Sequence, residues 1–122
     1  MAKASQAVIL ENEFYIIKAP NGKVLEVKNF NTENGAAIQL WSYAGHPWQQ
    51  WQFVDAGEGR WRIRNRFTGK FIDLALGGVV EGTWLHQWGR TSGLSQCWEL
   101  ESTRNGRTRI RNVLADKYID LV

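Results

Sequence analysis

The sequence lacks most of the residues that catalytic and metal sites require. Its single cysteine, Cys97, excludes an internal disulfide and a site with several thiolate ligands, so we expect a small thiol that is buried or half-buried. The two histidines, His46 and His86, accompany no nucleophile motif, phosphate-binding glycine loop or metal-ligand spacing. We therefore expect no enzyme activity, no metal and no cofactor.

Long apolar runs and a strong charge are also missing. The first residues offer one lysine and a four-residue apolar run, too short for a secretory signal, and no run approaches the length of a membrane span. We expect no membrane insertion, and a protein that is cytoplasmic or released without a signal peptide. With 15 basic and 12 acidic side chains the net charge is +3, too mild to demand an anionic partner.

Tryptophan is what the sequence has in excess. Seven tryptophans in 122 residues must each be buried or displayed for a reason, because the ring is large and mostly apolar. The length and the 43% of apolar residues suit one core, so we predict a single domain over residues 1–122.

The chain repeats itself every 47 residues, which divides it into units 14–60, 61–107 and a partial unit 108–122. Several residue types keep this interval: Phe14-Tyr15-Ile16, Trp61-Arg62-Ile63 and Thr108-Arg109-Ile110; Glu26, Asp73 and Asp120; Trp41 and Trp88; Gln49 and Gln96; Trp51 and Trp98. Agreement among independent residue types makes coincidence a poor explanation.

Each unit consists of short segments that alternate polar and apolar residues and are separated by turns such as Asn21-Gly22, Asn34-Gly35, Thr68-Gly69 and Asn105-Gly106. The expected strands cover residues 14–19, 23–27, 36–41 and 49–54 in the first unit, 61–66, 70–74, 83–88 and 95–100 in the second, and 108–113 and 117–121 in the third. Four strands per unit in three units predict an all-β fold, the β-trefoil, a six-stranded barrel capped by three hairpins.

The third unit is incomplete, because three units of 47 would need 141 residues. Residues 5–10 resemble residues 95–100 and can supply one of the two strands that are lacking. An edge left open invites pairing with another chain. We therefore consider two hypotheses, a homo-oligomer that completes the third repeat and a chain that belongs to a longer protein.

Strand alternation predicts which side chains face outward. Ile38 and Leu40 should enter the core, which displays Gln39 and Trp41. By the same alternation, Trp84, His86 and Trp88 should face outward, opposite Leu85. Three acids should also face outward: Glu26, Asp73 and Asp120. Trp51 and Trp98 share a face with Phe53 and Leu100 and should lie in the core.

An acid, an amide or imidazole, and a Trp ring should thus converge on the outside of each complete unit, which outlines a saccharide site. The ring can stack on the C–H face of a pyranose while the polar groups bond its hydroxyls. Simpler explanations exist, since an outward acid is commonly just solvated, an outward Trp can pack under a loop, and duplication also copies structural residues.

The segments Gln49-Gln50-Trp51 and Gln96-Cys97-Trp98, with the strand at residues 35–41, resemble the Gln-x-Trp repeats of ricin-type β-trefoil lectins over residues 14–122. The resemblance implies a carbohydrate-binding module that recognises galactose-type or related glycans, with one site per repeat. Carried over by position, it assigns Glu26, Gln39, Trp41, Gln49 and Trp48 to the first site, where Trp48 replaces the family's Asn, and Asp73, His86, Trp88 and Gln96 to the second, where Ser95 does. The second site keeps the family's Asp and ranks first, and the third keeps only Asp120.

Two other functions remain open. Arginines alternate through residues 60–66 and 107–111, and such a stripe can bind nucleic acid or a sulfated glycan, although the modest net charge weighs against nucleic acid and arginine also serves solubility. The loop at residues 43–48 offers a proline and two aromatic residues, which suits a protein-interaction or protease-inhibitor trefoil.

Overall fold

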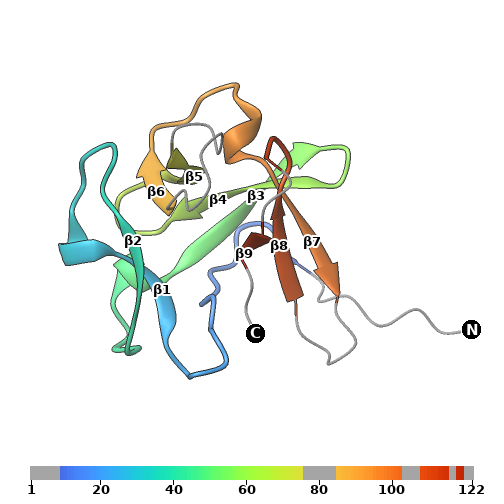
Figure 1. The fold of residues 1–122 in the computed structure, drawn as a ribbon. Helices are drawn as coiled ribbons and strands as arrows, with labels where there is room; N and C mark the ends of the chain where they lie inside the picture. Colours follow the sequence, from blue (N-terminus) through green and yellow to red (C-terminus); the bar gives the residue numbers. More distant parts are fainter. Residues whose placement is uncertain (1–8, 76–84, 103–107, 116–117, 120–122) are drawn as a thin grey trace, which may run out of the picture.

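The computed structural model describes residues 9–75, 85–102, 108–115 and 118–119, and this part of the chain is built from short β-strands and single turns of 3-10 helix (Figure 1). The strands are β1 (Val24–Val27), β2 (Ile38–Trp41), β3 (Trp51–Gly57), β4 (Arg60–Asn65), β5 (Phe71–Leu74), β6 (Leu85–Trp88), β7 (Trp98–Ser102), β8 (Thr108–Asn112) and β9 (Tyr118–Ile119). The 3-10 turns are η1 (Lys28–Phe30), η2 (Pro47–Gln49) and η4 (Leu94–Gln96). The all-β prediction is confirmed.

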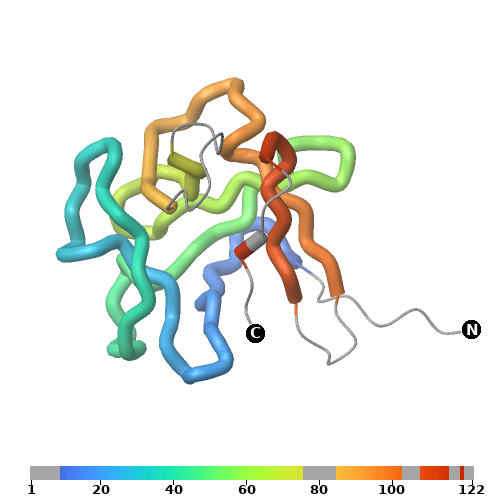
Figure 2. Tube along the Cα trace, in the orientation of Figure 1, coloured from blue at the N-terminus to red at the C-terminus, as the bar shows by residue number. Residues whose placement is uncertain are grey.

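The strands form two sheets. One is the hairpin β1–β2, and the other runs in the order β6-β5-β4-β7-β8-β9, with β3 also paired to β4. The strands β1, β5 and β9 begin at Val24, Phe71 and Tyr118, in steps of 47 residues. In Figure 2 the hairpins β1–β2 and β5–β6 lie side by side, and a bridge between Ala37 and His86 joins them. Among the described residues, no helix is long and apolar enough to cross a membrane.

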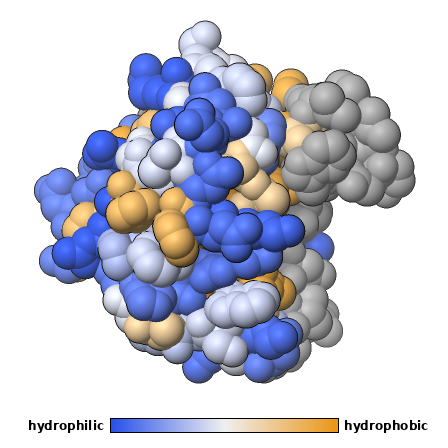
Figure 3. Space-filling model, turned by 90° about the vertical axis from the view of Figure 1, so that its left-hand side faces the viewer, coloured by the Kyte–Doolittle hydropathy of each residue, from blue (hydrophilic) through white to orange (hydrophobic). Residues whose placement is uncertain are grey.

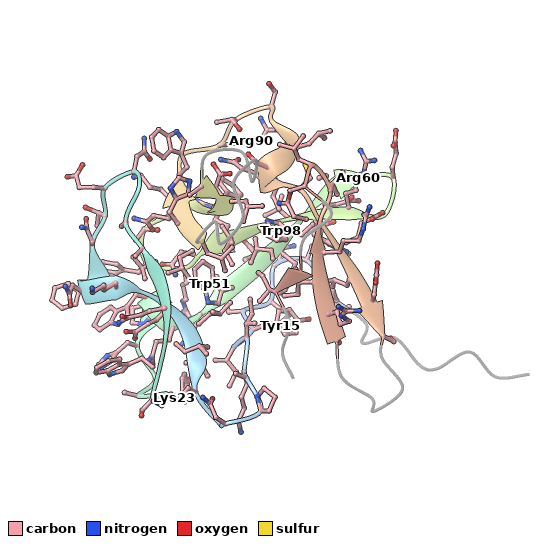
Figure 4. All side chains as sticks on the ribbon, in the orientation of Figure 1. Tyr15, Lys23, Trp51, Arg60, Arg90 and Trp98 are labelled. Atoms are coloured by element: carbon pink, nitrogen blue, oxygen red, sulfur yellow. The ribbon has the colours of Figure 1, made fainter. Side chains whose placement is uncertain are left out.

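The two tryptophans of the Gln-x-Trp segments form the centre of the core. Trp51 and Trp98 are fully buried, and each indole Nε1 donates a hydrogen bond at 3.1 Å to a strand carbonyl, that of Leu25 or of Ile72 (Figure 4). Because a buried indole N–H needs an acceptor, each bond satisfies the donor and also fixes the orientation of the ring. The prediction that both rings lie in the core is confirmed, and so is the burial of Cys97.

The expected strand at residues 14–19 is absent as a continuous strand. Tyr15 bridges to Trp51 of β3, whereas Lys18 bridges to Val24 of β1, so the segment crosses from one neighbour to another. Ile17 is buried, but Phe14 and Ile16 are exposed. The prediction of a strand at residues 14–19 therefore fails, because the segment pairs with two different neighbours through isolated bridges.

Leu40 contradicts the expected facing of β2, because 39% of its surface is exposed. The matching residue of the second unit, Gln87, has no exposed surface, since its backbone exchanges hydrogen bonds with Gly35 and Ala36 of the first hairpin. Among the described residues, no backbone hydrogen bond joins Leu40 to a neighbouring hairpin in this way. Burial at this position thus depends on a neighbouring unit and not on strand alternation.

Several predictions fall on residues outside the described part of the chain: Trp84, the turn Asn105-Gly106, Arg107, Asp120, and most of the strand at residues 5–10. Ile9 and Leu10, the described end of that last segment, belong to no strand.

Candidate functional site

Two acids that we expected to point into solvent are instead enclosed by their own hairpins. Glu26 pairs with Gln39 across β1 and β2, and Asp73 pairs with His86 across β5 and β6. Every residue of β1 and of β5 is buried, because one face of the strand lies on the core and polar side chains cover the other. The predicted outward orientation of both acids is corrected to this buried position.

The glutamines of the Gln-x-Trp segments lie beneath these acids. Gln49 Nε2 donates to Glu26 Oε1 at 3.0 Å and to the carbonyl of Ser42 at 2.8 Å, while its Oε1 accepts the N–H of Ala44 at 2.8 Å. Gln49 has no exposed surface. We expected this side chain to touch a ligand directly, and its buried amide instead suits a positioning role that holds the acid and the adjacent loop.

Gln96 repeats this arrangement in the second hairpin. It is fully buried, its Nε2 donates to Asp73 Oδ2 at 3.4 Å and to the carbonyl of Gly89 at 2.8 Å, and its Oε1 accepts the N–H of Thr91 at 3.0 Å. The same bonds at positions 47 residues apart indicate that the fold itself uses these amides.

Asp73, His86 and Trp88 form the first of two candidate ligand sites, which we call the second-hairpin site. His86 Nε2 lies 3.6 Å from Asp73 Oδ2, and the rings of His86 and Trp88 are 5.5 Å apart. Trp88 exposes 39% of its surface. Asp73 Oδ1 is buried and accepts no hydrogen bond from the described residues, so a buried acceptor lies beside an accessible aromatic ring.

Asp73 stays ionised in this setting. Burial raises the pKa of its carboxyl, but the nearby polar side chains of His86, Ser95 and Gln96, together with the charge of His86, outweigh burial and leave the pKa below its ordinary value. The acid can therefore act as a charged acceptor over the whole neutral range.

The first hairpin supplies the floor of the second-hairpin site, which sequence reasoning did not anticipate. Gly35 has a φ of +87° and packs under Trp88, whose Cζ3 would lie 3.8 Å from a Cβ added there. Gln87 Nε2 donates to the carbonyls of Asn31 and Glu33, both at 2.8 Å. The Asn-Gly turn was visible in the sequence, but its contact with a ring 53 positions later was not.

The second candidate, the first-hairpin site, consists of Glu26, Gln39 and Trp41. Both carboxylate oxygens of Glu26 are occupied, Oε2 by Gln39 Nε2 at 2.8 Å and Oε1 by Gln49. Trp41 exposes 58% of its surface, as the alternation of β2 predicted. Compared with the second-hairpin site, this one offers a more open ring and a less available acid.

Trp48, which we had placed at the first-hairpin site as a further stacking wall, packs among other aromatic rings. Its ring is stacked on His46 at 4.2 Å and lies 5.1 Å from Phe30 and 5.6 Å from Phe67. Phe30 and Phe67 were not among the predicted residues, because neither repeats at the 47-residue interval.

The sequence and the fold of the chain are both similar to those of known proteins. Residues 6–88 match the family described as ricin-type beta-trefoil lectin domain-like. The chain belongs to this family. The β-trefoil prediction is confirmed, and carbohydrate binding in general is the function that this lectin family supports. No curated protein sequence gives a significant match.

Several solved structures resemble the chain. A designed threefold-symmetric protein, ThreeFoil, is 30% identical with a TM-score of 0.84, over 88% of this chain and 77% of its own. An exo-beta-1,3-galactanase from Clostridium thermocellum is 28% identical with a TM-score of 0.82, over 90% of this chain. The chain spans only 24% of that galactanase. A Polyporus squamosus lectin, at 18% identity and a TM-score of 0.79 over 93% of this chain and 42% of its own, shares the fold.

The arginine stripe of this lectin-like domain is largely engaged within the molecule. Arg62 Nη2 donates to the carbonyl of Thr91 at 3.3 Å, and Arg66 Nη1 donates to Gln50 Oε1 at 2.7 Å. Three more arginines have partners. Arg60 forms an ion pair with Glu58 at 3.9 Å, and Arg111 forms one with Glu99. Arg64 Nε donates a hydrogen bond to the carbonyl of Gly69 at 3.3 Å. We expected an outward stripe, but only Arg64 and Arg66 are exposed among the described arginines of residues 60–66 and 109–111.

In the part of the chain that the structure describes, no three His, Cys, Asp or Glu side chains gather closely enough to hold an ion.

Proposed function

We propose that this domain binds neutral glycans reversibly, without catalysis, chiefly at the second-hairpin site. The observation that carries the proposal is the exposed ring of Trp88 beside Asp73, whose buried Oδ1 accepts no hydrogen bond from the described residues. A pyranose could stack its C–H face on the ring and donate a hydroxyl to the Asp73 carboxylate, whose side chain keeps 11% of its surface exposed. Hydrogen bonds to a charged acceptor are the stronger ones, so the acid would fix the orientation of the sugar.

Within this site each side chain has a distinct role. Trp88 supplies the stacking plane, Asp73 accepts a hydroxyl, and His86 contributes a polar contact next to both. Gln96 and Ser95 hold Asp73 in place from the buried side. We assign corresponding roles to Trp41 and Gln39 at the first-hairpin site, with Glu26 and Gln49 beneath them, and expect weaker binding there because both oxygens of Glu26 already have partners.

Galactose-type sugars are the favoured ligands. Because its axial hydroxyl lies on one side of the ring, galactose has an opposite face made largely of C–H groups, which suits a flat indole. The resemblance to ricin-type lectins favours the same sugars, as does the similarity to an exo-beta-1,3-galactanase, of which this chain matches a part. The hydrolytic activity of that whole enzyme is not carried over to this chain.

Affinity at one such shallow site should be low. Little surface is buried and hydroxyls exchange water for protein partners, so we expect a Kd of roughly 1 mM, about −4 kcal/mol. Stronger binding to surfaces would require several sites or several chains acting together, which makes the oligomeric state part of the function.

A glycan array followed by titration calorimetry tests the proposal. The wild-type protein should bind neutral galactosides at a strength that does not depend on salt, and Asp73→Asn and Trp88→Ala should each abolish measurable binding at the second-hairpin site. Glu58→Gln is the matched control, because it removes a carboxylate from a side chain that is 83% exposed. Binding that survives both site variants would contradict the proposal.

A polyanion-binding function would give the opposite salt dependence. Binding to heparin or single-stranded DNA through arginines weakens steeply as salt rises. Since most arginines of the stripe have partners within the molecule, we expect no such binding, and its detection without galactoside binding would transfer the function to the stripe.

A further inference from the structure

Four aromatic side chains from three separate loops form a cluster beside the first-hairpin site, which we call the Trp48 cluster. Phe30 comes from η1, His46 and Trp48 from the segment around η2, and Phe67 from the turn after β4. Trp48 lies at the centre, 4.2 Å from His46, 5.1 Å from Phe30 and 5.6 Å from Phe67 between ring centroids. Rings at such separations attract one another and form one surface.

The scaffold around Trp48 does not require aromatic rings, because the equivalent segments 47 residues later are built in the same way without them. Asn65 Nδ2 donates to the carbonyl of Trp48 at 3.0 Å, and Asn112 Nδ2 donates to that of Ser95 at 2.8 Å. The Oδ1 of each Asn accepts the two N–H groups that follow in its turn. Three positions of the cluster, His46, Trp48 and Phe67, correspond 47 residues later to Gly93, Ser95 and Leu114.

The cluster is also accessible. Phe30 exposes 58% and Phe67 45% of its surface. Figure 3 looks onto the side of the molecule where η1 lies, and it shows separate hydrophobic patches among largely hydrophilic residues. Clustered aromatic rings that are exposed, and that the fold does not need for its stability, are typical of a binding surface. The cluster is too small for a stable protein interface, which buries about 800 Å² on each partner.

The cluster is continuous with the first-hairpin site through the backbone. Trp48 directly precedes Gln49, whose amide bonds Glu26 at 3.0 Å. At that site both carboxylate oxygens have partners while Trp41 is the most exposed of the site's side chains. The first-hairpin site therefore offers a ligand few hydrogen-bonding groups, and its main accessible surface is the flat ring of Trp41.

We propose that the Trp48 cluster is a subsite for the aromatic aglycone of a glycoside whose sugar lies on Trp41. The inference rests on the proposed glycan binding and adds a ligand class to it, the aryl glycosides. The aryl group stacks against Phe30, Trp48 and Phe67, and these contacts replace the hydrogen bonds that Glu26 cannot offer. The two hairpins then select different ligands, hydroxyl patterns at the second and aryl groups at the first.

Indole N–H signals in two-dimensional NMR test this directly, because each tryptophan gives one signal that a single substitution assigns. The ligands are methyl β-galactopyranoside, phenyl β-galactopyranoside and free phenol. Phenyl galactoside should shift Trp41 and Trp48 and bind there about tenfold more tightly than the methyl compound, as one added aromatic contact would give. Methyl galactoside should shift mainly Trp88.

Trp48→Ser and Phe67→Leu are the decisive variants, since each introduces the residue found 47 positions later on the same scaffold, Ser95 or Leu114. Unchanged signals from Trp51 and Trp98 would verify the fold. Both variants should lose the preference for the phenyl compound at Trp41 and keep the Trp88 response to the methyl compound. Should Trp48→Ser fail to fold, Phe67→Leu decides, because its side chain is exposed.

The two proposals fail in different ways. Equal affinity for phenyl and methyl galactoside at Trp41, or a phenyl preference that both variants retain, would overturn the subsite. If methyl galactoside does not shift the indole signal of Trp88, the glycan proposal fails. In that case, a shift of the Trp48 signal by phenol or phenyl galactoside that Phe67→Leu abolishes would still support an aryl site.

Discussion

Asp73 and His86 face each other across β5 and β6 with 3.6 Å between Oδ2 and Nε2, whereas Gln39 Nε2 reaches Glu26 Oε2 at 2.8 Å in the matching pair of the first hairpin. The two pairs differ at both positions, and the acid of the second hairpin is less completely bonded. This contrast between two copies of one scaffold gives the site its most direct tests.

His86→Gln should make the second pair more like the first, with Asp73 still one methylene shorter than Glu26. A glutamine at this position would donate to Asp73 at a normal hydrogen-bond distance, as Gln39 does to Glu26, so Asp73 would have less capacity for a ligand hydroxyl. We expect galactoside binding to weaken several-fold. The free energy of unfolding should stay within about 0.5 kcal/mol of the wild-type value. Calorimetry measures the first and urea unfolding the second. Gln39→His is the reciprocal control, and stronger binding by His86→Gln would contradict the argument.

The lowered pKa of Asp73 predicts a particular pH dependence. Between the lowered native pKa and the ordinary value of 3.8, the unfolded chain takes up a proton that the native chain does not, so stability falls as pH falls. At neutral pH this contribution is fully present. Urea unfolding of the wild type and of Asp73→Asn, repeated from neutral pH to about pH 3, should show a smaller acid loss in the variant. Parallel curves for the two proteins would show that Asp73 makes no such contribution.

Trp98→Ala and Trp88→Ala should have opposite consequences. Trp98 is fully buried and its Nε1 is bonded to Ile72, so its truncation should cost about 3–5 kcal/mol of unfolding free energy and unfold much of the protein at room temperature. Trp88 is partly exposed, and its loss should cost no more than about 1 kcal/mol while removing binding. Circular dichroism in urea compares the two. Global unfolding of Trp88→Ala would show that its ring is a core element.

Gln96→Ala tests the positioning role of the buried amide. The substitution would leave the N–H of Thr91 and the carbonyl of Gly89 without their partner, which should cost about 1–3 kcal/mol and weaken galactoside binding by releasing Asp73. Gln50→Ala is the control, since Gln50 is only half-buried and both of its side-chain hydrogen bonds, from Arg66 at 2.7 Å and to the carbonyl of Gly45 at 3.4 Å, are exposed to solvent. Equal stability of the two variants would exclude the role that we assign to Gln96.

Gly35→Ala should disturb the floor under Trp88. The backbone φ of +87° at Gly35 is strained for any residue with a Cβ, although the nearest atom, Trp88 Cζ3 at 3.8 Å, would leave room for the methyl group. We expect a loss of about 1–2 kcal/mol and a shifted indole N–H signal of Trp88. Gly22→Ala provides the comparison, because it has a φ of +85° with nothing within 4 Å of the added Cβ. A Trp88 signal that moves equally in both variants would argue against a local effect.

Sequence patterns captured those parts of the molecule that depend on local alternation and duplication. The interval between Trp51 and Trp98, the burial of both rings, and the exposure of Trp41 and Trp88 followed from period-two strands repeated every 47 residues. Alternation failed at residues 14–19, because a segment that bridges two different neighbours has the side-chain pattern of a strand without the ladder.

The remaining features depended on contacts between segments that no local pattern links. Alternation assigns Glu26 and Asp73 to the outer face, yet both acids are buried and are hydrogen-bonded by the fully buried amides of Gln49 and Gln96. Leu40 and Gln87 hold equivalent places on their strands, but only Gln87 meets a neighbouring hairpin, so the polar residue is buried and the apolar one exposed. The sequence by itself determined the strands, their period and the aromatic core, because these follow from spacing along one chain. Tertiary structure alone decided which polar groups are desolvated and which rings meet, because burial is a property of the neighbours that close over a side chain and not of the strand that carries it.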